Sequence, residues 1–240
     1  TLKNSVELRG IVCKMRNFKI NIAALNEAIN VRFANRLRKL FEPELGYIPG
    51  FISETSIQQH FMLLMQHAAN EDFARRNLSV KYAFIATHLG MFFRFDPLFD
   101  KLRATALWKN PGVHKIVGLN RMFDHVDLMI AEGLINRNTG FAPGLLEACE
   151  MPKSTAPRDA VSRAAPKRAK ALGADAMERA FAAAVEHCAP GAPLADCAPR
   201  DAVIAAHFLG YGFWSDPLYN WVPAVLAEEG LTGLGDKLNG

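Results

Sequence analysis

The sequence is poor in cysteine and has no long apolar run. Its 240 residues include four cysteines, Cys13, Cys149, Cys188 and Cys197, without a Cys-x-x-Cys pair or a ligand-like spacing to histidine. We therefore expect free thiols, with a disulfide between Cys188 and Cys197 as the alternative. No stretch approaches the run of about 18 apolar residues that a membrane-spanning helix needs. The sequence thus predicts no membrane span.

Signals for export and for well-known chemistry are also missing. Residues 1–20 carry scattered charges and no apolar block, so we expect no signal peptide and a cytoplasmic location. The sequence contains no Gly-x-Gly-x-x-Gly, P-loop, Gly-x-Ser-x-Gly, His-Glu-x-x-His or EF-hand pattern. The Glu-x-x-His pairs of di-iron helix bundles are absent too. These absences favour a protein that is not an enzyme, while an enzyme with an unfamiliar site stays an alternative.

Positive charge is concentrated in two segments. The chain has a net charge of +4, yet residues 1–40 alone hold nine basic and two acidic side chains, and residues 151–170 hold six and one. Two basic segments on an otherwise acidic body favour an anionic partner, either an acidic protein or a nucleic acid. The densest group lies on one expected helix and consists of Arg32, Arg36, Arg38 and Lys39, which we expect to bind that partner.

Half of the residues are apolar, and their spacing is mainly helical. Apolar residues recur every three to four positions from Ile22 to Leu40, which predicts a helix that stops before Pro43. Further helices are predicted for Ser56–Ala69, for Ser79–Phe93 and, starting at Asn110-Pro111, for a long segment ending at Gly133. Alternating apolar residues between positions 6 and 22 predict a short β-hairpin at the N-terminus. The expected fold class is all-α.

One pattern occurs twice at an offset of 120 residues. Ungapped alignment of residues 61–99 with residues 181–219 gives ten identities in 39 positions, six of them in the shared pattern Leu-Gly-x-x-Phe-x-x-Asp-Pro-Leu. This predicts an internally duplicated helix-turn-helix unit, in which Asp96 and Asp216 each cap the helix that follows. An alternative is that the repeats form pockets lined by Phe93 and Phe213.

The repeat also suggests how the chain is divided. Residues 1–150 form a helical domain with a basic N-terminal arm and the first copy, and residues 171–240 form a shorter second copy that packs on it. Residues 151–170 are rich in alanine, proline and basic side chains and poor in large apolar ones. We expect them to be an exposed linker, or at most a solvated helix.

Four histidines occupy related positions in the two copies. His67 matches His187 at the offset of 120, and His88 and His207 are one place out of register. Such a set could bind a transition metal or supply axial ligands to haem. A histidine on a mostly apolar helix is more often a core or boundary residue, so this is the second hypothesis. The segment Asp124-His125-Val126-Asp127 is interpreted as a solvated helix face.

The sequence therefore predicts a non-enzymatic binding or adaptor protein without a cofactor, which uses basic surfaces to engage an acidic protein or a nucleic acid. The alternative is a protein that binds a metal or haem through histidine.

Overall fold

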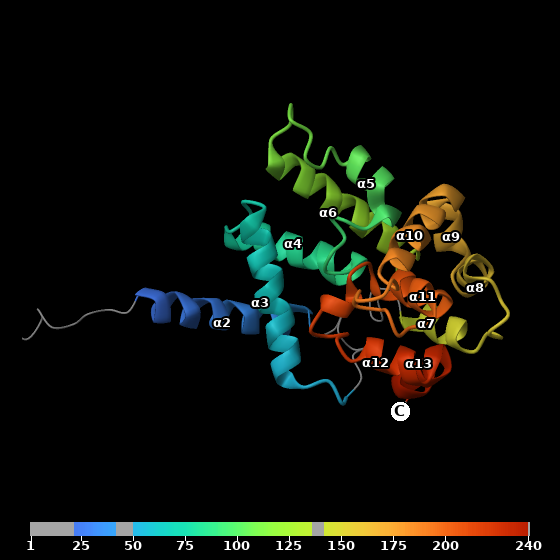
Figure 1. The fold of residues 1–240 in the computed structure, drawn as a ribbon. Helices are drawn as coiled ribbons and strands as arrows, with labels where there is room; N and C mark the ends of the chain where they lie inside the picture. The colour runs from blue at the N-terminus through green and yellow to red at the C-terminus, as the bar shows by residue number, and fades with distance from the viewer. Residues whose placement is uncertain (1–21, 42–49, 136–141, 240) are drawn as a thin grey trace, which may run out of the picture.

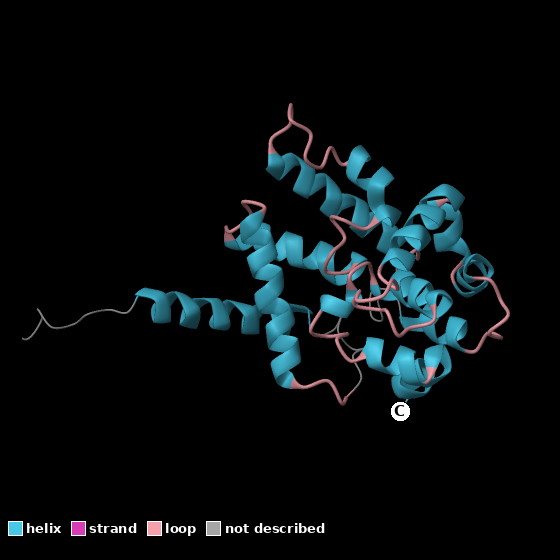
Figure 2. Cartoon of the chain, viewed as in Figure 1, coloured by secondary structure: helices cyan, strands magenta, loops and turns pink. Residues whose placement is uncertain are grey.

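The chain folds into helices joined by turns and loops (Figures 1 and 2). The structure, a computed structural model, describes residues 22–41, 50–135 and 142–239, and this part contains no strand. The predicted N-terminal hairpin lies outside the described residues. The elements in chain order are α2 (Ile22–Phe41), α3 (Glu54–Asn70), α4 (Arg76–Leu89), η2 (Pro97–Phe99), α5 (Asp100–Thr105), α6 (Lys115–Ala131), α7 (Ala142–Cys149), α8 (Pro157–Ala164), α9 (Pro166–Leu172), α10 (Ala174–Glu186), α11 (Pro199–Leu209), η3 (Phe213–Ser215), α12 (Val222–Glu228) and α13 (Gly230–Asn239).

The all-α prediction is confirmed, and the capping chemistry explains several helix ends. The Ser53 hydroxyl accepts a hydrogen bond from the Ser56 backbone N–H at 3.0 Å, which fixes the start of α3. The α4 helix ends at Leu89 and is followed by Gly90, whose φ of +98° suits a residue without a Cβ. None of the described helices combines the length and the apolar character needed to cross a bilayer.

The predicted start of α6 is wrong. The Asn110-Pro111 pair does not begin a helix, because the Asn110 side chain accepts a hydrogen bond from the Gly112 N–H at 2.9 Å and closes a separate turn. The helix instead begins after His114, whose Nδ1 accepts from the Ile116 N–H at 3.2 Å. A short polar side chain that bonds two residues ahead thus delays the helix by four residues.

Figure 1 places α2–α6 on one side of the molecule and α7–α13 on the other. The largest fully buried side chains come from both sides and include Phe61, Tyr82 and Phe93 as well as Phe208 and Phe213. The junction is tight, because η2 packs against α10 and the backbones at Gly90 and Gly210 meet directly. One core therefore joins the two sides.

The two segments paired by sequence contain similar elements. Each has two helices followed by a glycine of positive φ, Gly90 at +98° and Gly210 at +91°, and then an aspartate that accepts from an N–H two residues ahead. In the first segment Asp96 Oδ1 accepts from Leu98 N at 2.9 Å and caps η2, which leads into α5. In the second, Asp216 Oδ1 accepts from Leu218 N at 2.9 Å but starts a turn instead of a helix.

Residues 151–170, predicted to be a linker or at most a solvated helix, are largely helical, and half of them are exposed while a few are buried. They contain α8 and most of α9, and the side chains of Ala160 and Val161 are fully buried. Arg168 is also buried, at 4% exposure, and its Nη2 donates to the His207 carbonyl at 3.1 Å. Alanine side chains are small, so α8 and α9 can pack closely against the neighbouring helices. A search of the sequence for large apolar residues does not detect this kind of packing. The division of the chain into domains stays a prediction.

Candidate partner-binding groove

The α2 helix presents basic side chains on its outer side. Ala34, Leu37 and Phe41 are buried and hold the helix against the body, while Arg32, Arg36 and Lys39 are exposed. This division follows from the helical period, since residues three or four apart share a face. Within the described part of the chain, no acidic side chain forms an ion pair with any of these three residues.

Arg38 differs from the other three basic residues of α2. Its guanidinium reaches α3, where Nη2 donates to Glu54 Oε1 at 2.7 Å and Nη1 contacts the second carboxylate oxygen. This two-pronged pair occupies the donors of Arg38. Of the four residues predicted to bind a partner, three therefore keep their charge uncompensated in the described structure.

A groove of about 720 Å³ runs along α3 beside α2. Its floor is a stripe of the α3 surface on which Met62, Leu63 and Met65 are all partly exposed. Ile29 and Phe33 of α2 form the facing wall, and Ile29 is 46% exposed. The groove thus places flexible apolar side chains in solvent next to the basic side of α2. We call the following five side chains the groove residues: Ile29, Phe33, Met62, Leu63 and Met65.

The edges of the groove are polar and basic. Arg76, at the start of α4, lies over the Phe33 ring with its guanidinium carbon 5.9 Å from the ring centroid. Gln59 and Gln66 follow the α3 stripe, and Pro217 closes one end. Next to this end, His60 Nδ1 and Asp216 Oδ1 form a buried pair at 2.8 Å that fastens α3 to the turn carrying Pro217.

The basic residues of this site were predicted from the sequence, whereas the groove residues of α3 were not. The signal was present in His60-Phe61-Met62-Leu63-Leu64-Met65, where apolar residues cover more of the helix surface than one buried face requires. Phe61 and Leu64 fill the core, at 0% exposure each. Met62, Leu63 and Met65 are apolar side chains beyond those that the core buries. Exposed apolar surface of this kind often indicates a binding surface.

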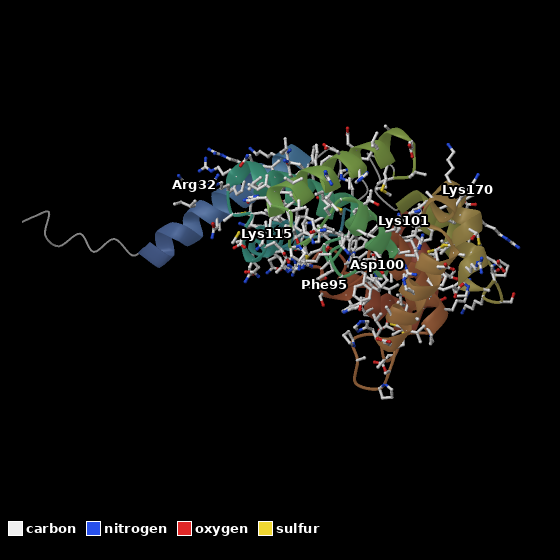
Figure 3. All side chains as sticks on the ribbon, turned by 90° about the horizontal axis from the view of Figure 1, so that it is seen from above. Arg32, Phe95, Asp100, Lys101, Lys115 and Lys170 are labelled. Carbon is white, nitrogen blue, oxygen red and sulfur yellow. The ribbon has the colours of Figure 1, made fainter. Side chains whose placement is uncertain are left out.

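The two basic segments do not merge into one surface. Figure 3 shows Arg32 on α2 at one end of the molecule and Lys170 on α9 at the other. Arg168 is withdrawn from solvent altogether, and burial lowers its pKa to about 9 against the opposing effect of the Asp96 carboxylate. The basic character of residues 151–170 is therefore partly structural.

The four histidines are not assembled into a metal site. The described residues contain no group of three or more His, Cys, Asp or Glu side chains that could hold a metal ion. His67 packs against Phe92, His187 bonds to the Tyr211 hydroxyl at 2.7 Å, and His88 Nδ1 lies 2.8 Å from the Phe84 carbonyl. His207 is enclosed by the core, and burial lowers its pKa well below the ordinary value. The haem alternative stays a prediction.

The cysteines described by the structure, Cys149, Cys188 and Cys197, are free thiols. Burial raises the pKa of Cys149 to about 12 and that of Cys197 to about 11, which keeps both in the unreactive thiol form.

The chain matches no family model, no curated protein and no solved structure.

Proposed function

We propose that this chain is a non-enzymatic binding protein whose α2–α3 groove receives an acidic, amphipathic helix of a partner protein. The proposal rests on two observations: the groove residues are partly exposed, and α2, which forms one wall of the groove, also carries three exposed basic side chains outside the lining, Arg32, Arg36 and Lys39. An amphipathic helix has the matching pattern, with an apolar face for the groove and acidic side chains for the basic edge.

The dimensions and lining support a helical occupant. The α3 helix has 17 residues, and at about 1.5 Å per residue it offers a surface of about 25 Å. Methionine side chains adapt their shape and are common on surfaces that take up hydrophobic helices. An apolar face lying along α3 would bury Met62, Leu63 and Met65, whose partial exposure otherwise has no structural use.

The charges would contribute mainly to the rate and the selectivity of binding. Uncompensated basic side chains attract an acidic segment over a distance set by the ionic strength, with a Debye length of about 10 Å at 0.1 M salt. Arg76 extends the basic edge to the α4 side of the groove. A basic helix would be repelled there, and a neutral helix would lack the attraction.

A nucleic-acid partner is supported less well. Binding to a phosphate backbone uses a continuous array of basic side chains, whereas Arg38 is paired with Glu54, Arg168 is buried, and Arg32 lies far from Lys170. The lining of the α2–α3 groove is mainly apolar, and Arg76 is its one basic side chain among the described residues. These features favour a protein.

We further infer that residues 61–99 and 181–219 derive from one duplicated unit. The support is the ungapped offset together with the paired glycines of positive φ and the paired aspartates. In this interpretation the second copy supports the first, because Asp216 and Pro217 stand at the end of the groove.

The test is a binding titration with a defined probe. We expect a fluorescent amphipathic peptide of about 18 residues, long enough for about five helical turns and built from leucine and glutamate, to bind the full chain. A scrambled peptide of the same composition should bind much more weakly. Leu63→Glu should abolish binding, and replacement of Arg32, Arg36 and Lys39 by Gln should weaken it by at least about tenfold, or 1.4 kcal/mol.

Arg38→Gln is the matched control, because it removes one positive charge from the same helix but from a residue already paired with Glu54. It should change affinity by less than about threefold, consistent with the small effect of an exposed ion pair. A single-stranded oligonucleotide of similar charge that binds more tightly than the peptide would support the nucleic-acid alternative. Equal binding of the helical and scrambled peptides would overturn the proposal that the groove binds an amphipathic helix.

A further inference from the structure

A second hollow lies between α5, α6 and α9, away from the α2–α3 groove. It has a volume of about 240 Å³. The residues that line it come from η2, α5, α6, the turn after α6 and α9, and they are Leu98, Phe99, Lys101, Leu102, Thr105, His125, Met129, Leu134, Ala171 and Leu172. We call this hollow the α5–α9 pocket.

The walls of the α5–α9 pocket are apolar. Leu98 and Phe99 are almost fully buried at its base, and Leu102, Met129 and Leu172 are partly exposed at its sides. The pocket is open to solvent, and an apolar group that packs against these walls removes apolar surface from water, which is favourable. An apolar group is therefore the better occupant.

Two nitrogen-bearing side chains stand at the mouth. Lys101 is exposed on α5, where Figure 3 labels it beside Asp100, and His125 is partly exposed on α6. In the described structure Asp100 bonds to Arg103 and also pairs with Arg179, and no acidic partner occupies Lys101. Asp124 and Asp127 flank His125 in sequence but are exposed and do not line the pocket. The mouth therefore offers a free cation and an imidazole above an apolar interior.

Thr105 adds a third polar group at the same opening. Its hydroxyl donates to the Lys101 carbonyl at 2.9 Å, one helical turn earlier, which leaves its oxygen able to accept but not to donate. The donors available to a ligand are thus the Lys101 ammonium and a His125 ring N–H. Donors without competing acidic groups suit a carboxylate.

We propose that the α5–α9 pocket binds a medium-chain aliphatic carboxylate, with its chain between Leu102 and Met129 and its carboxylate at Lys101 and His125. The volume equals that of about eight water molecules at about 30 Å³ each, which matches a chain of roughly six to ten carbon atoms. A long acyl chain exceeds this space. The site is separate from the proposed groove, so the two proposals stand or fall independently.

The experiment titrates the full chain with octanoate by isothermal calorimetry and compares it with acetate and 1-octanol. We expect saturable one-to-one binding of octanoate with Kd below about 1 mM, or about −4.1 kcal/mol. Acetate should show no binding because it lacks the chain. Octanol should bind at least fivefold more weakly because it lacks the charge. An absence of octanoate binding overturns the proposal.

Two matched pairs of variants locate the ligand. Ala171→Phe fills the pocket from its exposed rim and should abolish octanoate binding, whereas Ala182→Phe, at an exposed site on α10 that does not line the pocket, should leave it unchanged. Lys101→Gln should weaken octanoate at least fivefold without changing octanol, and Lys153→Gln, an exposed lysine outside the pocket, should change neither. Circular dichroism and thermal unfolding confirm that each variant is folded.

Octanoate binding that is equal in the native chain and in Ala171→Phe would place the ligand elsewhere and overturn the site. Equal affinity for octanoate and octanol in the native chain would overturn the assignment of the carboxylate to Lys101 and His125. Loss of both ligands in Ala171→Phe, with loss of the octanoate advantage in Lys101→Gln, supports it.

Discussion

Gly90 and Gly210 touch through their backbones, although 120 residues separate them. A Cβ added to Gly90 would lie 2.8 Å from the Gly210 Cα, and one added to Gly210 would lie 2.7 Å from the Gly90 Cα. Both residues have extended ψ and positive φ, which only glycine adopts without strain. The two sides of the molecule therefore meet at a point where no side chain fits.

This contact predicts a large effect of alanine at either position. Gly90→Ala should lower the free energy of unfolding by more than about 3 kcal/mol, because backbone strain adds to an overlap with backbone atoms that cannot move aside. Gly173→Ala is the control, since Gly173 has a similar backbone geometry, φ +83° and ψ 156°, with nothing within 4 Å of the added Cβ. Urea unfolding measures both. Equal losses would mean that strain alone, and not the contact, makes Gly90 necessary.

The buried pair of His60 and Asp216 should stabilise the fold and hold Pro217 in place at the end of the groove. Asp216→Ala removes a partner of His60 and of the Leu218 N–H, so we expect a loss of about 3 kcal/mol or more. Asp216→Asn keeps an acceptor for Leu218 and should cost less. In a double-mutant cycle with His60→Ala, an interaction energy near zero would contradict a direct role of the 2.8 Å contact.

Asp96 predicts a distinct pH dependence of stability. Burial raises the pKa of its carboxyl to about 6, although the N–H groups of Leu98 and Tyr211 and the charge of Arg168 favour the anion. A folded pKa above the ordinary 3.8 means that the folded chain holds this proton more firmly than the unfolded chain. The contribution of Asp96 to the free energy of unfolding should therefore fall as the pH rises from about 4 to about 6, by about 3 kcal/mol in total.

Asp96→Asn tests this dependence because asparagine resembles the protonated acid. The variant should match the native chain near pH 4 and become relatively more stable by pH 7, as followed by thermal unfolding across that range. The opposite trend, with the variant losing stability toward pH 7, would show that Arg168 and the N–H donors outweigh burial.

Residues 151–170 should resist proteolysis, contrary to what their composition suggests. Val161 is fully buried in α8 and packs in the same core as Leu145 and Ala202, so limited trypsin digestion should spare this segment as long as the chain is folded. Val161→Asp should destabilise the chain by about 3 kcal/mol or more, since it buries a charge. Rapid cleavage after Arg158 or Arg163 in the native chain would contradict the packing.

The sequence predicted that the long helices exist, although the ends of α4 and α6 differ from the prediction, and it predicted the packing of the short helices poorly. The helix predicted for Ile22–Leu40 is α2, almost residue for residue, because a repeated three-to-four spacing is a local signal. The turn at Asn110 depended on a side chain bonding two residues ahead, which the spacing does not reveal. The burial of Arg168 depended on the His207 carbonyl, 39 residues away.

The candidate site was predictable only in its charged half. Arg32, Arg36 and Lys39 could be found because charge is visible in a sequence. The sequence could not predict the pairing of Arg38 with Glu54 or the exposure of Met62 and Met65. Both depend on the angle at which α2 packs against α3. That angle is a property of tertiary packing.

The position of α8 and α9 also limits how this chain can be shortened. A fragment ending at residue 150 would retain Asp96 and its Leu98 N–H donor but lose the Tyr211 N–H and Arg168, and the apolar side chains that pack against residues 151–240 would be exposed to water. Such a fragment should aggregate when produced alone. Production of residues 151–240 in the same cell should keep the fragment soluble, because the two fragments share one hydrophobic core and can associate without a covalent bond.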